Sequence, residues 1–404
     1  MTEGERSVDE AVAELIATLD PIEGIERVPT TAALARILAE DIASPLDLPA
    51  FDNAAMDGYA LRSADLGQPA LREIGTALAG HAFLGGVEPG CCVRIMTGAP
   101  LPPGADTVVM LEDTVREDGQ VRVIHVPAAG ANVRRRGEHV ARGDIVLASQ
   151  RQLRATDLGL AAAIGRSELP VMRRLRVGLL STGDELADPP APLAAGAAYD
   201  ANRPFLRAAL ERSGFEAIDL GICPDRVADF EHTLARALAD RLDAVVISGG
   251  AAQGDADIVR RAGGVRFVAL NIRPGRGLAV ARLTQSGHAT ALLGLPGNAV
   301  AAFVMFHLVA RPVLTHLAGG IATVPASIPV PLAAPVHVRG GRIDYRRASF
   351  VRDARGTLTV APLKDQGSAM LRTVTEADAL IAVGPQTDYA AGEPVETIPL
   401  GLLE

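Results

Sequence analysis

The sequence predicts a multi-domain protein of the α/β-plus-β class, built around a sheet in which parallel strands dominate. Three short apolar runs indicate this sheet: Arg176–Leu180, Ala244–Ile247 and Ala289–Leu293. Each run ends in a glycine-containing turn and leads into a helical pattern, which is typical of buried strands in a parallel sheet. The chain has 404 residues, and a single core stops growing near roughly 250–300 residues, so we expect several domains.

The first 174 residues predict a helical region that is interrupted by a β-rich insertion. The capping-box pattern Ser7–Glu10 predicts a helix through about Asp20, and a second helix is expected over Thr31–Asp41. From about Phe51 to Val140, short β runs alternate with turns rich in glycine and proline. The runs are 93–96, 107–111 and 121–126. Helical spacing returns over Leu153–Ile164.

The second half predicts the α/β segment and then a β-rich tail. Helices are expected over Asn202–Ser213, over Ala228–Arg241 and from about Asn298 onward. After Pro325 the pattern alternates, which predicts a small antiparallel barrel or sandwich. The expected domains are a helical linker (1–48 and 141–174), the β-rich insertion (49–140), the α/β domain (175–324) and the C-terminal β domain (325–404).

The composition excludes several classes of function and location. A formal net charge of −9 argues against a binder of nucleic acids or anionic membranes. The three cysteines show no metal-binding spacing, and their odd number suits a reducing cytosol. The polar N-terminus lacks the pattern of a signal peptide, and the longest apolar stretch, Ala299–Ala310, has 12 residues where a membrane span needs about 20. We therefore expect a cytoplasmic protein with no membrane and no nucleic acid as partner.

The three turns are expected to face one crevice. In parallel sheets the ligand lies outside the carboxyl ends of the strands, where backbone N–H groups and helix N-termini hold anions. The turns are Ser181–Glu185, Ser248–Gly250 and Leu295–Asn298. Four carboxylates accompany the first two turns: Asp184, Glu185, Asp255 and Asp257. A phosphate-binding cradle lined with carboxylates predicts a phosphorylated substrate that is handled with a divalent cation.

Several strings extend this picture to a family resemblance. Two lie in the β-rich insertion: Pro49–Ala60, and Val93–Pro100 with its continuation Pro103–Asp106. Together with Ser181–Leu186, Ser248–Gly250 and Gly294–Asn298, they closely resemble molybdopterin molybdenumtransferases. These are the molybdate-insertion enzymes of molybdenum cofactor synthesis, and gephyrin's C-terminal domain belongs to the same family. The likeness covers nearly the whole chain, in order.

The resemblance implies a fold and an activity. The implied parts are a helical linker, an inserted β-rich domain, a three-layer α/β domain that binds the pterin, and a C-terminal β-barrel. Family members are homodimers whose site lies between the α/β domain of one subunit and the inserted domain of the other. The implied reaction inserts molybdate into adenylylated molybdopterin with Mg²⁺ present and releases AMP. A molybdopterin adenylyltransferase is the implied upstream partner.

The candidate catalytic and metal-binding groups are carboxylates with one hydroxyl. Asp57, Glu185, Asp225 and Asp257 are expected to act in catalysis and to bind the metal, and Thr97 to offer a hydroxyl and free amides to an oxyanion such as molybdate. Simpler alternatives stay open. Glu185 could cap the next helix, Asp57 and Asp225 could be turn residues, and Thr97 could form an ordinary turn.

A larger set is expected to bind the substrate through backbone amides, short side chains and two cations. Its members are Ser181, Thr182, Gly183, Asp184, Ser248, Gly249, Gly250, Asp255, Arg273, Arg276, Pro296, Gly297, Asn298 and Ser368. Glycines in turns also serve backbone conformation alone, and Asp255 could simply cap a helix.

Three other features favour structural roles. Arg134–Arg136 is expected to be an ion-paired face or a phosphate clamp, because the net charge is negative and no aromatic residues are interleaved. His307 lies in an apolar helical pattern, so we expect it to be a core histidine whose ring is hydrogen-bonded. The adjacent Cys91 and Cys92 have no neighbour that would lower a thiol pKa, so we expect a structural role.

Some positions depart from the family pattern. Arg273 and Arg276 replace lysines, a mild change in a chain whose only lysine is Lys364. His139 stands in place of a typical aspartate, which removes a negative charge and a hard oxygen ligand. Further departures are Ala251–Gln253, Ala269, Gly277 and Ala299. They keep open a catalytically weakened paralogue that carries molybdopterin or the finished cofactor, or a dimeric scaffold.

Overall fold

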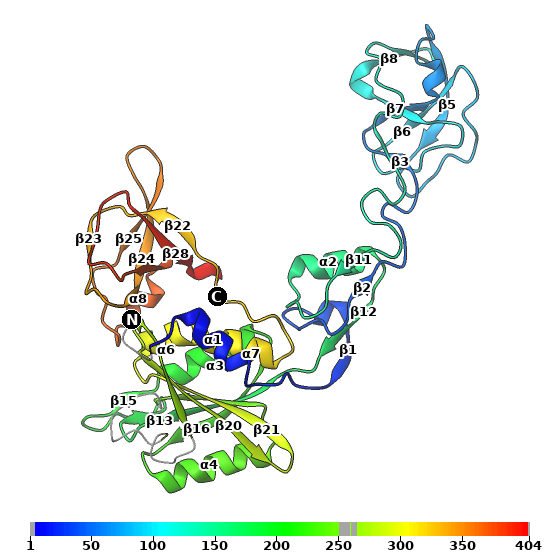
Figure 1. Cartoon of the computed structure of the whole chain (residues 1–404). Helices are drawn as coiled ribbons and strands as arrows, with labels where there is room; N and C mark the ends of the chain where they lie inside the picture. Colours follow the sequence, from blue (N-terminus) through cyan, green and yellow to red (C-terminus); the bar gives the residue numbers. More distant parts are fainter. Residues whose placement is uncertain (1–4, 250–258, 260–264, 403–404) are drawn as a thin grey trace. The chain divides into compact units, whose positions relative to one another are not determined.

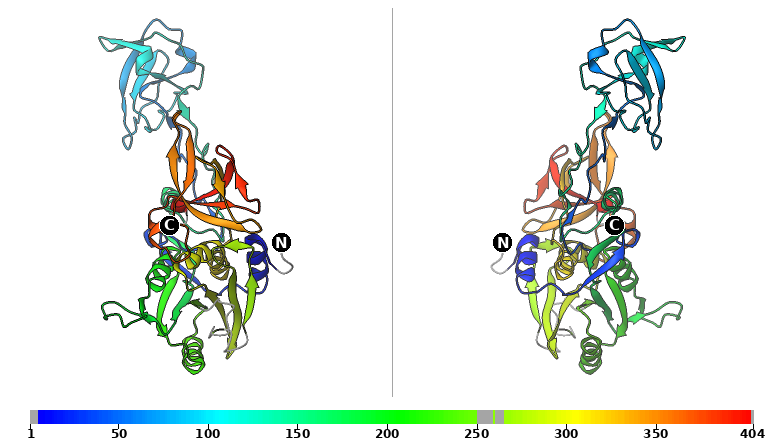
Figure 2. Two further views of the ribbon diagram at one scale, coloured as in Figure 1. Left: turned by 90° about the vertical axis from the view of Figure 1, so that its left-hand side faces the viewer. Right: turned by 90° about the vertical axis from the view of Figure 1, so that its right-hand side faces the viewer.

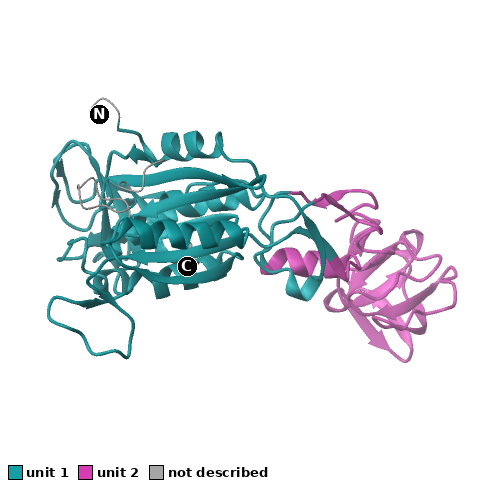
Figure 3. Ribbon diagram, turned by 90° about the horizontal axis from the view of Figure 1, so that it is seen from below, with its two compact units in different colours: residues 1–39, 150–154, 169–404 teal, residues 40–149, 155–168 magenta. Residues whose placement is uncertain are grey.

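The chain forms two compact units. The computed structural model describes residues 5–249, 259 and 265–402. Unit 1 comprises Met1–Ala39, Gln150–Arg154 and Leu169–Glu404, and unit 2 comprises Glu40–Ser149 and Ala155–Glu168 (Figure 3). Each unit has hydrophobic clusters of its own.

A six-stranded mixed sheet forms the centre of the α/β part of unit 1 (Figure 1). Its strands, in spatial order, are β16 (Glu216–Cys223), β13 (Arg176–Thr182), β17 (Ala244–Ser248), β21 (His288–Leu295), β20 (Gly277–Gln285) and β18 (Arg266–Ala269). The first four strands run parallel, and β20 and β18 pair antiparallel. The three strands predicted from the apolar runs are confirmed as β13, β17 and β21.

Helices cover both faces of this sheet, because its strands are apolar on both sides. One face packs against α1 (Val8–Ile16), α3 (Asn202–Arg212) and the helical run of α6 (Ala299–Met305), η4 (Phe306–Ala310) and α7 (Arg311–Leu317). The other face packs against α4 (Val227–Ala239) through Phe230 and Ala237. The side views show the same order of layers (Figure 2). The predicted helices at 202, 228 and 298 are confirmed, each to within a few residues at its start.

The N-terminal segment confirms one predicted helix and contradicts another. Ser7 caps α1 in a capping box: its hydroxyl accepts from the Glu10 amide at 3.2 Å, and the Glu10 carboxylate accepts from the Ser7 amide at 2.8 Å. The helix expected over 31–41 is wrong. Only a short 3₁₀ turn forms at Thr30–Ala32, and the following residues make isolated bridges, Ile37 to Gln152 and Leu38 to Val171. Burial of these side chains against distant segments overrides the helical spacing.

The helix that begins at Ala299 extends beyond the 12-residue apolar stretch Ala299–Ala310 seen in the sequence. The helix Ala299–Leu317 has 19 residues and is long and apolar enough to cross a membrane, so the expectation that this segment is too short to span one is wrong. However, 83% of its apolar window is buried inside the protein. It packs on the sheet and on α1 as the central core helix of the α/β domain.

The tail forms a second, mostly antiparallel sheet. Its spatial order is β19 (Ile272–Arg273), β24 (Ile343–Arg352), β26 (Ala379–Val383), β28 (Pro394–Pro399) and β22 (Ile328–Pro331), with β25 (Leu358–Pro362) on β24. A small pair, β23 (Val336–His337) and β27 (Asp388–Tyr389), lies beside it. The predicted antiparallel strands are confirmed, and closure into a barrel stays a prediction. Because β19 pairs with β24, the segment carrying Arg273 joins this sheet.

Unit 2 contains the β-rich insertion. Its six-stranded sheet has the order β7 (Thr107–Met110), β4 (Gly58–Leu61), β6 (Cys91–Ile95), β5 (Leu71–Ala77), β9 (Gln120–Val123) and β8 (Thr114–Glu117). The predicted runs at 93, 107 and 121 correspond to β6, β7 and β9. The unit also contains two short strand pairs, β2 (Ile42–Ala43) with β11 (Ile145–Leu147) and β3 (Asn53–Ala54) with β10 (Val133–Arg134). Its helices are α2 (Ala155–Ala163) and the short 3₁₀ turns Ser63–Asp65 and Leu111–Asp113.

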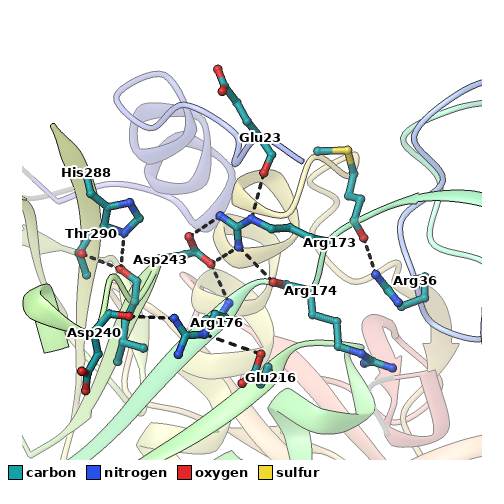
Figure 4. Close-up of polar contacts among 12 residues, drawn as sticks. Glu23, Arg36, Arg173, Arg174, Arg176, Glu216, Asp240, Asp243, His288 and Thr290 are labelled. Atoms are coloured by element: carbon teal, nitrogen blue, oxygen red, sulfur yellow. Dashed lines mark hydrogen bonds and ion pairs between the residues drawn. The ribbon is translucent and has the colours of Figure 1, made fainter. Parts of the chain in front are cut away.

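An ion pair between the buried Asp243 and the partly buried Arg173 ties chain segments together at the amino ends of the parallel strands (Figure 4). The Asp243 carboxylate accepts from both terminal nitrogens of Arg173, at 2.7 and 2.8 Å, and from the Arg176 amide at 2.8 Å. Arg173 Nε also donates to the Glu23 carbonyl at 2.9 Å. This cluster therefore joins the segment before β1 (Ile25–Pro29), the segment after β12 (Glu168–Met172) and the start of β17.

Candidate functional site

A cavity of about 560 Å³ lies at the carboxyl ends of β13, β17 and β21. The three predicted turns meet there. The first contributes Thr182 and Gly183, the second Ser248 and Gly249, and the third Gly297 and Asn298. Their neighbours complete the lining: Glu185, Leu186, Ala198, Tyr199, Asp200, Ala201, Asn202, Asp225, Ala299 and Ala369.

Glycine is required at two points in this wall. Gly249 has a φ of +106°, and a Cβ on it would lie 2.6 Å from the Thr182 carbonyl oxygen. Gly183 has a φ of +151°, and a Cβ there would lie 2.5 Å from Glu185 Oε2. The Glu185 carboxylate therefore lies directly over Gly183, where the positive φ favours glycine and the flexible carboxylate could move aside. At Gly249 the second turn approaches the backbone of the first too closely for any larger residue.

Glu185 and Asp225 supply the acidic side of the cavity. The Glu185 side chain is exposed to it and has no hydrogen-bond or ion-pair partner among the described residues. The alternative that Glu185 caps a helix is wrong, because the short strand β14 (Leu186–Ala187) follows it. The segment between β14 and β15 (Ala198–Tyr199) contains Pro189, Pro190 and Pro192, so no helix starts before α3.

Asp184 and Ser181 lie outside the cavity lining. Asp184 Oδ1 accepts from the Asp225 amide at 3.0 Å and so fixes the loop that presents Asp225. Ser181 is fully buried in β13, and its hydroxyl has no hydrogen-bond partner within the described part of the chain. In the part of the chain that is described, no three His, Cys, Asp or Glu side chains gather as a preformed metal site.

A second cavity, of about 930 Å³, adjoins the first through Gly297 and Asn298. It contains the predicted Arg273, Arg276, Pro296 and Ser368. The Asn298 side chain does not cap α6; its Nδ2 donates to Ser368 Oγ at 3.1 Å, linking the third turn to the β-rich tail. Arg276 Nε pairs with Glu5 at 3.1 Å, and Arg273 donates to the Arg339 carbonyl at 2.7 Å.

Sequence reasoning missed several lining residues. Arg339 and Arg346 line the second cavity beside Asp344, and they come from the tail, where the alternating pattern indicated strands only. Asn202 lines the first cavity, and the sequence assigned it only to the start of a helix. A short polar string, Asp200–Arg203, at the start of α3 was the available signal.

Unit 2 holds Asp57 and Thr97 as a hydrogen-bonded pair. Asp57 Oδ1 accepts from both the amide and the hydroxyl of Thr97, each at 2.7 Å. The amide bond first, and then the hydroxyl bond, lower the pKa of the Asp57 carboxyl. The expectation of free Thr97 donors is wrong for its own amide and hydroxyl proton, since both point at Asp57. Asp57 is exposed, and His139, from the same unit, is exposed too.

The structure also settles the three features assigned structural roles. Arg135 and Arg136 pair with Asp52 and Asp47 at 2.7 and 2.6 Å, so the expectation of an ion-paired face is confirmed for these two of the three arginines. Burial raises the pKa of the Cys92 thiol to about 12, which suits a structural cysteine. His307 is buried in the core as predicted, but neither ring nitrogen has a hydrogen-bond partner among the residues that the structure describes, so the expectation of a hydrogen-bonded ring is wrong there.

Four predicted features lie outside the described residues. They are Gly250, Asp255, Asp257 and the departure at Ala251–Gln253.

Comparisons with known proteins cover nearly the whole chain. Residues 6–165 match the MoeA N-terminal region (domains I and II), 178–316 match a probable molybdopterin binding domain, and 329–400 match the MoeA C-terminal region (domain IV). Among curated relatives, the molybdopterin molybdenumtransferase of Haemophilus influenzae is 35% identical, over 98% of this chain and 99% of its own. Molybdopterin molybdenumtransferase 2 of Mycobacterium tuberculosis is 34% identical, over 97% of this chain and 98% of its own.

A solved structure gives the same result. The crystal structure of the molybdopterin biosynthesis moeA protein from Pyrococcus horikoshii superposes with a TM-score of 0.80 at 27% identity, covering 98% of this chain and all of that one. Sequence and fold thus agree over the full length. The chain belongs to the molybdopterin molybdenumtransferase family and is a transferase of molybdenum cofactor biosynthesis that acts on a molybdopterin-related substrate.

Proposed function

We propose that the chain inserts molybdate into adenylylated molybdopterin in a magnesium-dependent reaction that releases AMP. The observation that supports this most strongly is the pair of adjoining cavities with opposite charge. The first contains the carboxylates Glu185 and Asp225, and the second contains four arginines and one aspartate among its lining residues. A substrate with a phosphoanhydride and several anionic groups needs both cations and a metal-binding edge.

The side chains fit a magnesium ion. Mg²⁺ in enzymes is commonly held by one or two carboxylates and completes its shell with water and substrate phosphate oxygens. Glu185 offers a carboxylate without a partner among the described residues, and Asp225 lies in the same wall. We assign these two residues to the ion, with Asp57 and Asp257 as further ligands. When bound, the ion would neutralise charge on the phosphate groups.

The chain's own residues do the positioning. The first-turn residues Thr182 and Gly183, with Gly249 and Gly297, offer backbone groups to the substrate phosphate. Arg273 and Arg276, with the neighbouring Arg339 and Arg346, attract its other anionic groups. The carboxylate of Glu185 can orient a water for cleavage of the phosphoanhydride, because no protein donor occupies it in the described residues.

We further propose that the working form is a cytoplasmic homodimer in which each site is completed by Asp57 from the inserted domain of the second subunit. Thr97 holds this carboxylate in its ionised form. The adenylylated substrate would come from a molybdopterin adenylyltransferase.

One observation favours a second candidate, a carrier of molybdopterin or cofactor. His139 replaces a carboxylate that the family pattern places there, and imidazole is a poor magnesium ligand. A carrier would bind the adenylylated pterin without cleaving it.

The decisive assay mixes the purified protein with adenylylated molybdopterin, molybdate and Mg²⁺ and follows AMP by chromatography. The proposal expects AMP and molybdenum-loaded pterin in equal amounts, and loss of both when a chelator removes the metal. Pterin that binds tightly while its adenylyl group stays intact would establish the carrier instead.

A further inference from the structure

Asn202 connects two of the three turns at the first cavity. Its side-chain Nδ2 donates to Ser248 Oγ at 2.7 Å and to the Gly297 carbonyl oxygen at 2.7 Å. Ser248 follows β17, and Gly297 follows β21. Ser248 and Gly297 lie 46 and 95 residues further along the chain than Asn202. One side-chain amide therefore links two segments that are far apart in the sequence.

The orientation of this amide follows from its partners. A backbone carbonyl can only accept, so the atom facing Gly297 must be the nitrogen. Both amide hydrogens are then in use, one on each partner. Since Ser248 Oγ accepts one of them, the hydroxyl proton of Ser248 is left to donate elsewhere. Asn202 therefore sets Ser248 as a hydrogen-bond donor in the wall of the cavity.

The backbone of Asn202 is itself held firmly. Asp200 Oδ1 accepts from the amides of Asn202 and Arg203, each at 3.1 Å, at the start of α3. The other oxygen of Asp200 accepts from Arg203 Nε at 3.2 Å. Arg203 also pairs with Asp188 and Asp219. Asn202 and Asp200 are both buried, so the amide is fixed before any substrate arrives.

We propose that Asn202 is a positioning residue of the transferase reaction. It keeps the second and third turns at a fixed separation, and it directs the Ser248 hydroxyl towards a phosphate oxygen of the substrate. A donor that is oriented in advance costs no reorganisation when charge develops on that oxygen. This inference rests on the proposed function, because the proposed substrate supplies the phosphate group to which the Ser248 hydroxyl would donate.

Asn202→Asp is the sharpest variant, because aspartate has nearly the same shape but no N–H groups. The carboxylate cannot donate to the Gly297 carbonyl, and it accepts from the Ser248 hydroxyl, which reverses that hydrogen bond. The Ser248 proton is thereby withdrawn from the substrate. Loss of one hydrogen bond to a charged group corresponds to a fall in kcat/KM of about tenfold to a hundredfold.

Thr290→Val serves as the matched control. Thr290 is fully buried in β21, at the end opposite the cavity, and its hydroxyl donates to the Leu242 carbonyl at 2.6 Å. The variant loses one buried hydrogen bond in the same sheet, so it is expected to lower the melting temperature while kcat and KM stay at wild-type values. A purely structural role for Asn202 would give the same pattern in Asn202→Asp.

The experiment measures kcat, KM, melting temperature and the Kd for adenylylated molybdopterin in Asn202→Asp, Ser248→Ala, the double variant and Thr290→Val. We expect the double variant to be slower than Ser248→Ala by a smaller factor than Asn202→Asp produces alone, because the two changes share the Ser248 donor and only the tether to Gly297 is lost in addition. Wild-type kcat and Kd in folded Asn202→Asp, or effects that simply add in the double variant, would overturn the inference. If the wild-type protein binds the pterin without turnover, the proposed function fails, and the Kd values alone decide the role of Asn202.

Discussion

Asp57 accepts two hydrogen bonds from Thr97, from its amide and its hydroxyl, both at 2.7 Å and both at the same carboxylate oxygen. The second oxygen of Asp57 receives no hydrogen bond within the described residues. One residue thus orients the carboxylate and leaves one oxygen available to a ligand.

Thr97→Val tests this arrangement. The variant removes the hydroxyl donor but keeps the amide, which is the larger cause of the lowered pKa, so the pKa of Asp57 should rise only part of the way to its ordinary value. Because the carboxyl pKa is lower in the folded than in the unfolded protein, the ionised carboxylate stabilises the fold at any pH above its ordinary pKa. This stabilisation is lost as the pH falls through the lowered pKa, so Thr97→Val, with the higher pKa of the two proteins, should lose it at a higher pH. Carboxyl carbon titration by NMR measures the shift. Thr97→Ser should titrate like the wild type, and an unchanged titration in Thr97→Val would exclude the hydroxyl as a cause.

Gly249→Ala is expected to disturb the cavity wall. Its φ of +106° disfavours alanine, and the new Cβ would lie 2.6 Å from the Thr182 carbonyl oxygen, so the first two turns must move apart. We expect a loss of about 1–3 kcal/mol in unfolding free energy and weaker binding of the adenylylated pterin. Urea denaturation and titration calorimetry measure the two effects.

The control is Gly287→Ala, in the turn between β20 and β21. Gly287 has a φ of +77° and nothing within 4 Å of an added Cβ, so the variant carries the backbone strain without the collision. It should lose some stability and keep the affinity. Equal affinities in the two variants would contradict the close approach of the turns.

His307→Leu should stabilise the protein. The ring is buried among Phe205, Phe303 and Phe306, and both nitrogens lack a hydrogen-bond partner among the described residues. Removing such a buried polar group stabilises a protein by about 1–3 kcal/mol. Burial also lowers the pKa of His307 to about 3 from an ordinary 6.5. Below pH 6.5 the unfolded chain binds a proton that the folded chain does not, so the wild type loses stability as the pH falls from 6.5 towards 3.

The leucine variant lacks this component, so its advantage in melting temperature should widen on acidification. His316→Leu is the control on the same helical run: its Nε2 lies 2.9 Å from the Leu19 carbonyl, so leucine should destabilise there. A lower melting temperature for His307→Leu at pH 5 would show that the ring has a partner after all.

Asp243→Ala should destabilise unit 1 strongly. The substitution leaves Arg173 without its buried counter-ion and the Arg176 amide without an acceptor (Figure 4). Asp243 is buried but Arg173 is about a third exposed and can be hydrated once its partner is gone, so we expect a loss of about 1.5–3 kcal/mol, the contribution of hydrogen bonds to a charged group. Asp20→Ala breaks the exposed pair with Arg282 in the same region and should cost about 0–1 kcal/mol. Chemical denaturation compares the two variants, and equal losses would contradict the role of the pair between Asp243 and Arg173.

The sequence predicted the elements that are defined by local burial. Strands β13, β17 and β21 are continuous apolar runs because both faces of the sheet are covered, and Ser7–Glu10 carries its capping box within four residues. The Thr31–Asp41 helix failed because Ile37 and Leu38 are buried against Gln152 and Val171, a contact that periodicity cannot show.

The parts of the candidate site that follow from local sequence were predictable, and the parts that depend on distant contacts were not. Glycines and acids next to strand ends identified the turns, since the ends of parallel strands share one edge. Asn202 and Arg339 were missed, because their relation to the cavities depends on contacts with segments far along the chain. The segment after Glu185 was expected to start a helix, and its prolines instead delay the helix to Asn202.

The most direct test of the central claim compares Glu185→Gln with Glu216→Gln. Glu185 lies at the carboxyl end of β13 in the first cavity. Glu216 is the first residue of β16, at the amino ends of the parallel strands and away from this cavity, and makes a loose ion pair with Arg176 at 3.8 Å. Both variants remove one charge and keep the size of the side chain.

The measurement is the rate of AMP release from adenylylated molybdopterin with molybdate and Mg²⁺. We predict that Glu185→Gln is slower by about a hundredfold or more with an unchanged melting temperature, and that Glu216→Gln matches the wild type. A wild-type rate in Glu185→Gln would contradict the assignment of the acidic cavity as the reaction site.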